Sequence, residues 1–418
     1  MKTYLVGGAV RDKLLNIPIK DRDWVVVGAS VRQMLDNNYQ QVGKDFPVFI
    51  HPTSKEEYAL ARTERKSGKG YTGFTVHASP EVTLEEDLLR RDLTINAIAE
   101  DHKGQLIDPY HGQQDISNKL LRHVSPAFSE DPLRVLRVAR FAARFAHLGF
   151  TIATETQDLM KDIVRSGEMQ SLTAERVWQE IQRALTEKSP QVFFQVLKDC
   201  HALAEIIPEL DNLFGVPQPE KHHPEIDTGI HTLMVLEQAS KLSSNPAARF
   251  AALVHDLGKA ATPKEKWPSH KGHETLGKSL IQNLSTRLKV PNEYRELGIL
   301  VSLHHTACHS SNRAANTAKP PAEQAQALLD TLENTDAFRR PERFVLFLIA
   351  CEADARGRLG LELEPYPQNK IMRNALSLTQ NINPQQLVDS GVKGPEIGIQ
   401  LKRLRLAALT QSISSNKL

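Results

Sequence analysis

The pattern of apolar positions divides the chain into a strand-rich beginning and a long helical remainder. Short apolar runs between polar or glycine residues predict strands at the start of the chain. The runs are Tyr4–Val6, Trp24–Val27, Val48–Ile50, Glu57–Ala61 and Leu106–Ile107. Helical spacing appears between them, as at Val31–Leu35, and becomes continuous from Glu130 onward. We therefore predict an α+β fold, in which a small sheet with helices on one side is followed by an all-α region.

Changes in this pattern suggest four parts. We expect a small α+β domain at residues 1–125, a helical neck and body at 126–222, a second helical domain at 223–357 and a helical tail at 358–418. The tail has its clearest helical spacing at Ile397–Leu409. The Pro-, Ala- and Ser-rich stretch Cys308–Ala322 is predicted to be a loop within the second helical domain.

Composition narrows the possible locations and partners. The 418 residues carry a formal net charge of only +2, so any contact with RNA must come from a local basic face. Cys200, Cys308 and Cys351 are too widely spaced for a zinc motif, and such cysteine use fits a reducing cytoplasm. We see neither a signal peptide nor an apolar run of about 18 residues. The expectation is a cytoplasmic protein with no membrane segment.

The first chemical motif follows the first predicted strand. A glycine pair in the run Gly7-Gly8-Ala9-Val10-Arg11-Asp12 lies between that strand and a predicted helix. Glycine allows a phosphate to approach the backbone closely, and the N–H groups at a helix start attract anions. Asp21 and Asp23 then lead into the strand Trp24–Val27. Residues two apart on a strand point to the same side, so the two carboxylates favour a cation such as Mg²⁺ between them.

The run GGAVRD followed by DRD resembles the signature of the nucleotidyltransferase superfamily. More narrowly it resembles the class II branch, which holds tRNA CCA-adding enzymes and bacterial poly(A) polymerases. The resemblance implies that residues 1–125 form the nucleotidyltransferase palm, with Asp21 and Asp23 as catalytic ligands of Mg²⁺. It also implies that Gly8 and Arg11 bind nucleotide.

Two further stretches of the palm carry charged motifs. The basic, Gly-rich stretch Arg62–Tyr71 is predicted to be a mobile loop, which is either simply solvated or covers a triphosphate or RNA backbone. Within it, Glu64 is a possible additional carboxylate. Arg90-Arg91-Asp92 is predicted just before or within an amphipathic helix. As a surface ion pair it would contribute little. In the class II enzymes the matching arginine binds nucleotide, which implies that role for Arg91, with Asp92 fixing the sugar.

An arginine-rich helix is predicted after the palm, with Ser129 as its possible N-cap. Four arginines recur at helical spacing and fall within an arc of about 120°; they are Arg134, Arg137, Arg140 and Arg144. Among so many apolar neighbours they require an anion or carboxylates as partners.

The segment Glu130–Arg137 resembles the EDPLRxxR motif of the class II enzymes. That resemblance implies that Asp131 and Arg134 read the incoming base, since a planar donor and an acceptor can match the edge of C or A. It further implies that Arg137 and Arg140 hold phosphate or ribose. In the capped helix that starts at Thr173, Glu175 and Arg176 either brace the base-reading helix or lie on a plain surface.

Histidines concentrate in the second helical domain. Nine of the sixteen lie between His222 and His309. The order His231, His255-Asp256 and Asp354 resembles the HD phosphohydrolase family, although a single buried His-Asp pair is more often structural. The resemblance implies that these four residues bind a divalent metal, Ni²⁺ or another ion such as Mg²⁺, with His304 and His305 as alternatives. It also implies phosphoesterase action, for example on 2′,3′-cyclic phosphates, or action as a 2′-nucleotidase or phosphatase.

Together these resemblances imply template-independent addition of C, C and A to the tRNA 3′ end from CTP and ATP, with a fused phosphohydrolase. The expected partners are tRNA, CTP and ATP, and the expected state is a monomer or homodimer. A poly(A) polymerase is the nearest alternative, but the HD segment and the lack of a long basic tail disfavour it. A catalytically inactive nucleotide- or RNA-binding protein, and a phosphohydrolase whose first domain only grips RNA, are the alternatives from other classes.

Overall fold

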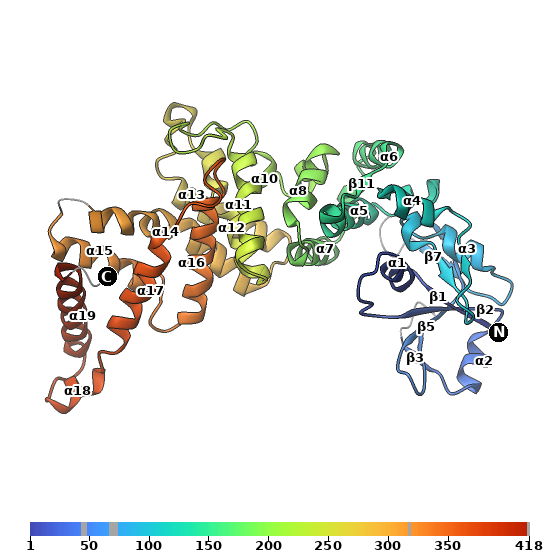
Figure 1. Cartoon of the computed structure of the whole chain (residues 1–418), viewed down its shortest axis with the longest axis horizontal. Helices are drawn as coiled ribbons and strands as arrows, with labels where there is room; N and C mark the ends of the chain where they lie inside the picture. Colours follow the sequence, from blue (N-terminus) through green and yellow to red (C-terminus); the bar gives the residue numbers. More distant parts are fainter. Residues whose placement is uncertain (43–47, 67–73, 317–318, 416–418) are drawn as a thin grey trace. The chain divides into compact units, whose positions relative to one another are not determined.

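The computed structural model of the chain describes residues 1–42, 48–66, 74–316 and 319–415 (Figure 1). The chain forms two compact units, Met1–Ile206 and Ile207–Leu418. No helix within the described residues is long and apolar enough to cross a membrane. The described fold is α+β at its start and helical thereafter, as the apolar pattern predicts.

One mixed sheet forms the centre of the palm. Its strands lie in the order β3-β4-β5-β2-β1-β8-β9, and only β2 and β5 pair in parallel. A separate hairpin is made by β6 and β7. The strands are β1 (Lys2–Val6), β2 (Asp23–Val27), β3 (Gln40–Val42), β4 (Val48–Ile50), β5 (Glu57–Leu60), β6 (Thr63–Lys66), β7 (Phe74–His77), β8 (Ala99–Glu100) and β9 (Leu106–Ile107).

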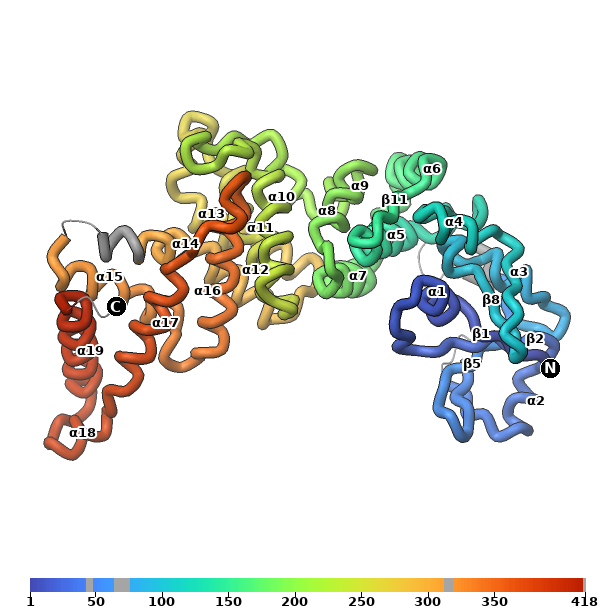
Figure 2. Tube along the Cα trace, viewed as in Figure 1, coloured from blue at the N-terminus to red at the C-terminus, as the bar shows by residue number. Residues whose placement is uncertain are grey.

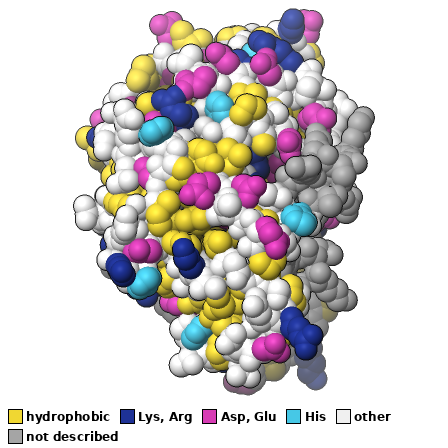
Figure 3. Space-filling model, turned by 90° about the vertical axis from the view of Figure 1, so that its right-hand side faces the viewer, with side chains coloured by type: hydrophobic (Ala, Val, Ile, Leu, Met, Phe, Trp, Pro, Cys, Tyr) yellow, Lys and Arg dark blue, Asp and Glu magenta, His cyan; other side chains and the backbone are white. Residues whose placement is uncertain are grey.

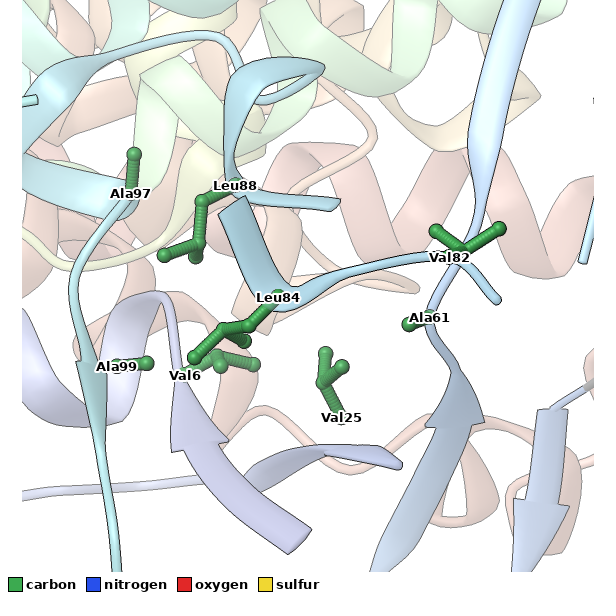
Figure 4. Close-up of a cluster of buried hydrophobic side chains, with 8 residues drawn as sticks. All are labelled: Val6, Val25, Ala61, Val82, Leu84, Leu88, Ala97 and Ala99. Carbon is green, nitrogen blue, oxygen red and sulfur yellow. The ribbon is translucent and has the colours of Figure 1, made fainter. Parts of the chain in front are cut away.

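Helices cover both faces of this sheet, so the expectation of helices on one side is wrong. On one face, Val6 and Val25 pack against Leu84 and Leu88 of α3 (Leu84–Leu89), as Figure 4 shows. On the opposite face, α1 (Gly8–Leu14) and α2 (Val31–Asp36) supply buried apolar side chains. The alternation of side chains along a strand supplies both faces, because Tyr4–Val6 of β1 and Trp24–Val27 of β2 are apolar at successive positions.

The remainder of the first unit is mostly helical, and its elements after residue 125 lie in the range predicted for the neck and body. Its elements are α4 (Gly112–Asn118), α5 (Leu133–Phe145), α6 (Thr154–Arg165), α7 (Ala174–Thr186), α8 (Pro190–Asp199) and α9 (Ala202–Ile206), with a short pair of strands, β10 (Leu120–Leu121) and β11 (Thr151–Ile152). The arginine-rich helix α5 packs against α7 and α8. Figure 3 shows the face of the protein that lies on the right in Figure 1. The Lys and Arg side chains on that face are interspersed with Asp and Glu.

The second unit is all helical, and its central helices α11, α12, α14 and α16 pack on one another (Figures 1 and 2). Its helices are α10 (Pro208–Asp211), α11 (Thr228–Leu242), α12 (Pro246–Val254), α13 (His273–Arg287), α14 (Asn292–Asn316), α15 (Pro321–Asn334), α16 (Pro341–Arg356), α17 (Pro367–Gln380), α18 (Pro384–Asp389) and α19 (Glu396–Ser414). The predicted tail helix lies within α19, which packs on α15 and α17.

Four local predictions are wrong. Cys308–Ala322 is not a loop, because α14 continues to Asn316 and α15 begins at Pro321. The stretch Arg62–Tyr71 contributes strand β6, whereas its residues 67–71 and the side chain of Glu64 lie outside the described part. Arg91 and Asp92 follow helix α3 instead of preceding it or lying within it.

The fourth correction concerns the start of α5. Ser129 is not its N-cap: the Ser129 hydroxyl donates to the Pro126 carbonyl within a short 3-10 helix, and α5 begins at Leu133. Asp131 supplies the capping interaction, since its Oδ1 accepts from the Leu133 backbone N–H at 3.0 Å. The carboxylate to which the motif resemblance gives a base-reading role is thereby fixed to the helix start.

Candidate catalytic sites

The two acids of the first motif lie at one end of strand β2. Asp23 is the first residue of β2, where it pairs with Val6 of β1 and with Glu57 of β5. Asp21 lies in the loop before the strand, so the argument from strand periodicity does not apply to it. Both acids are exposed, and they interact electrostatically. Loss of hydration raises the pKa of Asp23 and Asp21 raises it further, while Arg91 opposes this shift.

Glu57 is a third carboxylate at this sheet edge, and the motif analysis missed it. In a parallel pair, residues in register point to the same side of the sheet, so Glu57 and Asp23 share a face. Glu57 stands at the start of a predicted strand, and only the pairing of β5 with β2 shows that it lies beside Asp23. Carboxylate oxygens grouped in this way form a site suited to a hard divalent cation.

Arg91 lies against the glycine turn beside these acids. Gly7 has φ +67°, and a Cβ built on it would lie 2.9 Å from the Arg91 guanidinium. One amino group of Arg91 donates to Asp87 at 3.1 Å. Its Nε is buried and makes no hydrogen bond to the described residues. Gly7 therefore gives Arg91 room to hold donors near Asp23, where a triphosphate would need them.

Each arginine of the α5 stripe has a partner from another element, as its apolar surroundings require. Arg137 pairs with Asp92 at 2.7 Å, and Arg140 pairs with Glu180 at 2.6 Å. Arg144 pairs with Asp12 at 2.9 Å. Arg134 instead donates to two backbone carbonyls, those of Ala127 at 3.0 Å and Arg90 at 2.6 Å. The stripe thus connects the palm to the neck through ion pairs.

Arg11 and Arg140 are buried within this connection. Arg11 donates to Asp12 and Asn96, and its guanidinium lies 5.1 Å from the centre of the Phe145 ring. Burial lowers the pKa of Arg11, although Asp12 opposes the shift. These contacts give both arginines a role in holding α1 and α7 against α5. Their direct binding of nucleotide, like that of Gly8, stays a prediction.

Asp92 is the central carboxylate of the network. It is buried and accepts hydrogen bonds from Asn96 at 3.0 Å and from the Arg137 guanidinium at 2.8 Å. Burial alone would raise the pKa of Asp92. Arg137, Asn96 and Arg134 outweigh that effect and hold the pKa well below its usual range.

We expect Asp92→Asn to lower the free energy of unfolding of the first unit by about 3–5 kcal/mol, because Arg137 loses its closest partner inside the protein. The folded-state pKa of Asp92 lies below its unfolded value of about 3.9. Its stabilising contribution is therefore complete above that pH and is lost as the pH falls toward the folded-state pKa. Thermal unfolding at pH 7 and at about pH 3 tests this, with a smaller difference between wild type and variant in acid.

The matched control is Asp162→Asn, which removes an exposed partner of Arg165 at 3.0 Å in the same unit. Such a surface pair contributes about 0–1 kcal/mol. Equal melting temperatures for the Asp92 and Asp162 variants at pH 7 would contradict the assignment of Asp92 as the centre of the network.

Asp131 is held between α5 and α7. Its Oδ2 accepts from Arg176 at 2.9 Å, while its Oδ1 caps α5. Its side chain remains 20 % exposed, so part of it is accessible to a ligand. Thr173 is the N-cap residue of α7, and Arg176 braces Asp131 from the first turn of that helix. Glu175 is exposed in the same turn.

The second unit brings all four predicted metal ligands together. His231 comes from α11, His255 and Asp256 follow α12, and Asp354 comes from α16; all are buried. The Oδ1 atom of Asp354 lies 3.1 Å from His231 Nε2 and 3.6 Å from His255 Nε2. His255 Nε2 lies 3.1 Å from Asp256 Oδ2. These spacings are close enough for one ion to join His231, His255 and Asp354.

A second group of possible ligands shares Asp256. The Oδ1 atom of Asp256 lies 3.2 Å from His273 Nε2 and 3.7 Å from His305 Nε2. Of the two alternative histidines, His305 belongs to this cluster, whereas His304 is not part of either group. His273 was missed because it stands alone at the start of α13. Asp256 Oδ1 is buried and faces the Nε2 atoms of both rings, so it could share a cation with them.

The ring orientations and charges fit metal binding. His255 Nδ1 lies 2.7 Å from the Ala252 carbonyl oxygen, and His231 Nδ1 lies 3.1 Å from that of Gly357, which leaves both Nε2 atoms facing the centre. Burial alone would lower the pKa of His255, but Asp256 and Asp354 raise it to about 10. Carboxylates that favour a proton so strongly would equally favour a divalent cation. Burial lowers the pKa of His305 to about 3, which favours the neutral imidazole that metal binding would require.

The cluster of candidate metal ligands opens into a cavity of about 530 Å³. Asp256, His273, His305 and Asp354 line it, and Lys259 and Arg358 add positive charge. Lys259 is buried, with its Nζ 2.6 Å from Asp256 Oδ2. A cavity of this size beside these possible metal ligands can admit a nucleotide-sized phosphate ester.

Family comparisons match three successive parts of the chain. Residues 3–122 match the family described as the poly A polymerase head domain. Residues 149–214 match the probable RNA and SrmB-binding site of polymerase A, and residues 228–335 match the HD domain. The HD match contains His231, His255 and Asp256, whereas Asp354 lies beyond it.

Solved structures share the fold. A CCA-adding enzyme in complex with ATP has a TM-score of 0.64 at 21% identity, covering 98% of this chain and 86% of that one. The Thermotoga maritima CCA-adding enzyme complexed with tRNA has a TM-score of 0.60 at 20% identity, covering 99% and 91%. At such identities the likeness concerns the fold.

Full-length relatives are much closer in sequence. The multifunctional CCA protein of Hahella chejuensis is 59% identical over 416 residues, covering 100% of this chain and 96% of that protein. The multifunctional CCA protein of Aliivibrio salmonicida is 58% identical over 416 residues and is covered completely, as is this chain. With the palm, the arginine network and the HD centre in one polypeptide, the chain belongs to the family of multifunctional CCA proteins.

Proposed function

We propose that this protein adds C, C and A to the 3′ end of tRNA from CTP and ATP, and that its second unit is a metal-dependent phosphohydrolase. The observation that carries the first activity is the grouping of Asp21, Asp23 and Arg91 at one end of the palm sheet. Anionic metal ligands and a guanidinium donor lie together there, as transfer of a nucleotide from a triphosphate requires. All three cysteines are free and buried, which suits the cytoplasm as the compartment.

In the palm, Asp21 and Asp23 would hold a divalent cation, which we propose to be Mg²⁺, with Glu57 available on the same face. When bound, such a cation lowers the pKa of the primer hydroxyl and stabilises charge on the transferred phosphoryl group. Arg91 donates to the triphosphate and keeps it near Asp23. The Gly7-Gly8 turn leaves room for this approach, because side chains there would meet Arg91 or Arg11.

We assign base selection to Asp131 and Arg134, one turn apart at the start of α5. Their orientation is fixed by Arg176 and by two backbone carbonyls, so donor and acceptor keep a constant spacing. Arg137 is one-third exposed and can contact ribose or phosphate while it pairs with Asp92. A rigid protein edge of this kind would replace a nucleic-acid template.

We expect Arg176→Ala to weaken discrimination between CTP and UTP by roughly 10-fold, because Asp131 loses the partner that fixes its Oδ2 and a base contact contributes about 1–3 kcal/mol. The measurement is kcat/KM for each nucleotide on tRNA that lacks its 3′-terminal CCA. Arg165→Ala, which removes an exposed arginine on α6, is the control. A slower enzyme with unchanged selectivity would contradict the bracing role.

Incubation with labelled CTP and ATP on the same truncated tRNA tests the first activity. We expect two C residues and then one A. Extension by ATP alone would establish the poly(A) polymerase alternative, and no extension would support a binding protein.

For the second unit, we propose hydrolysis of phosphate esters at RNA 3′ ends, 2′,3′-cyclic phosphates among them. His231, His255, Asp256 and Asp354 would hold Ni²⁺ or another divalent cation, and His273 and His305 with Asp256 offer a second position. A cation bound there supplies an activated water and polarises the phosphate. Lys259 and Arg358 line the cavity and would neutralise the phosphate oxygens.

A further inference from the structure

The two carboxylate oxygens of Asp354 have separate neighbours. Its Oδ1 faces His231 and His255 in the metal cluster. Its Oδ2 accepts a hydrogen bond from His309 Nε2 at 2.7 Å. A short, charge-assisted hydrogen bond to one oxygen restricts rotation of the carboxylate and leaves the other oxygen directed at the cluster.

His309 is in turn held by the beginning of the tail. Its Nδ1 lies 2.9 Å from the hydroxyl of Tyr366, the N-cap residue of α17. Gln368 donates to the His309 carbonyl oxygen at 3.3 Å. In the tautomer that donates from Nε2, Nδ1 is unprotonated and can accept from the Tyr366 hydroxyl, which lies within hydrogen-bond distance. The tyrosine thereby selects the tautomer that can hold Asp354.

We propose that Tyr366, acting through His309, is a positioning residue that orients Asp354 toward the metal of the phosphohydrolase centre. This inference rests on the proposed phosphohydrolase function. Tyr366 lies beyond residues 228–335, which match the HD domain. It also lies beyond residue 357, where the second helical domain is predicted from the sequence to end. Both Tyr366 and His309 line the 530 Å³ cavity. The tail accordingly forms part of the metal centre instead of being an appended surface element.

A purely structural role for Tyr366 is the competing explanation. Its ring is buried, and its hydroxyl also lies 3.5 Å from Cys308 Sγ. Loss of packing would affect folding, whereas loss of Asp354 orientation would affect metal affinity. Tyr366→Phe separates the two because it keeps the ring and removes only the hydroxyl.

The test measures Mn²⁺ affinity of the full-length chain by competition with a chromophoric chelator. We expect Tyr366→Phe to weaken binding about 10- to 100-fold, the usual effect of removing a partner that orients a metal ligand. His309→Leu should give a similar loss. His309→Gln retains an amide donor near the Nε2 position and should recover most of the affinity. Tyr294→Phe is the matched control and should bind as wild type. Tyr294 is a buried tyrosine on α14, the helix that also carries His309, and its ring packs on Phe250.

A double-mutant cycle tests the route through His309. In the His309→Gln background, Tyr366→Phe should cause no further loss, because glutamine does not depend on the tautomer. Equal losses for Tyr366→Phe in both backgrounds would overturn the proposal. So would wild-type affinity in Tyr366→Phe, or equal losses in His309→Gln and His309→Leu, which would make His309 a ligand itself. If Tyr366→Phe lowers the melting temperature, the His309→Gln and His309→Leu pair decides alone.

The metal measurement also separates this inference from the function on which it rests. A wild-type chain that binds Mn²⁺ tightly but hydrolyses no 2′,3′-cyclic phosphate would refute the proposed phosphohydrolase. The Mn²⁺ affinities of the variants would then still decide the positioning role of Tyr366. A wild-type chain that binds no divalent cation at the second unit would refute both.

Discussion

Replacing Asp23 by asparagine is expected to reduce nucleotide addition by about 10³-fold or more, because the metal that this carboxylate would hold is worth several kcal/mol in the transition state. Asp23 occupies the end of β2 beside Val6 and shares a face with Glu57. Asparagine has nearly the same size, so the strand pairing should persist while the charge is lost. The measurement is the initial rate of CMP incorporation into tRNA that lacks its 3′ end.

Asp36→Asn provides the control for this variant. Asp36 is an exposed acid at the end of α2, whose nearest cation is Arg32 at 4.0 Å, and its loss should leave the rate unchanged. Binding of truncated tRNA without nucleotide should also be similar in both variants. A loss of only a few fold in Asp23→Asn would mean that the exposed acids do not form the metal site.

Five of the palm strands could be predicted to within one or two residues, whereas β3, β6, β7 and β8 were not predicted. Val48–Ile50 and Leu106–Ile107 are strands with the expected bounds, and β1 and β2 begin only one or two residues earlier. Runs of β-branched and aromatic residues between polar segments determine these strands locally. It was harder to predict whether helices cover one or both faces of the sheet. A strand that is apolar at successive positions does not indicate how many of its sides are covered.

Helix boundaries failed where local signals compete. Ser129 has the chemistry of an N-cap, but the preceding 3-10 helix uses its hydroxyl. The N-cap residue of α5 is Pro132, and Asp131 accepts from the Leu133 N–H. The stretch Cys308–Ala322 has the small and polar composition of a loop, yet its first part lies on α14 with Cys308 buried. There, packing against α17 and the metal cluster outweighs composition.

The candidate sites show the same division between local and long-range information. His255 and Asp256 are adjacent, so a motif could indicate them. His273, His309 and Tyr366 reach the same cavity from three different helices or their ends, and only packing joins them. For the arginine stripe, periodicity predicted that carboxylates would be needed. Periodicity could not indicate which arginines would be buried. Arg140 of the stripe is buried, and so is Arg11 of α1.

Asp256→Asn is expected to lower hydrolysis of a 2′,3′-cyclic nucleotide by about 10²-fold or more, since its carboxylate faces both groups of possible metal ligands and a metal contributes several kcal/mol. Metal content, measured after dialysis against Ni²⁺ or Mn²⁺, should fall in parallel. The pKa of Asp256 lies well below its usual value because His255 and Lys259 outweigh the effect of burial. The group is therefore a carboxylate at any pH at which the enzyme is assayed, and asparagine removes a full charge.

Asp330→Asn is the matched control in the same unit, because Asp330 is half exposed and lies 3.7 Å from Lys402. This variant should keep its metal and its hydrolytic rate. Asp256→Asn should also keep the rate of CMP incorporation, which depends on the first unit. Loss of metal without loss of hydrolysis would place the reaction elsewhere in the cavity. Loss of hydrolysis with full metal content would instead make Asp256 a group that acts on the substrate directly, leaving His231, His255 and Asp354 as a sufficient metal site.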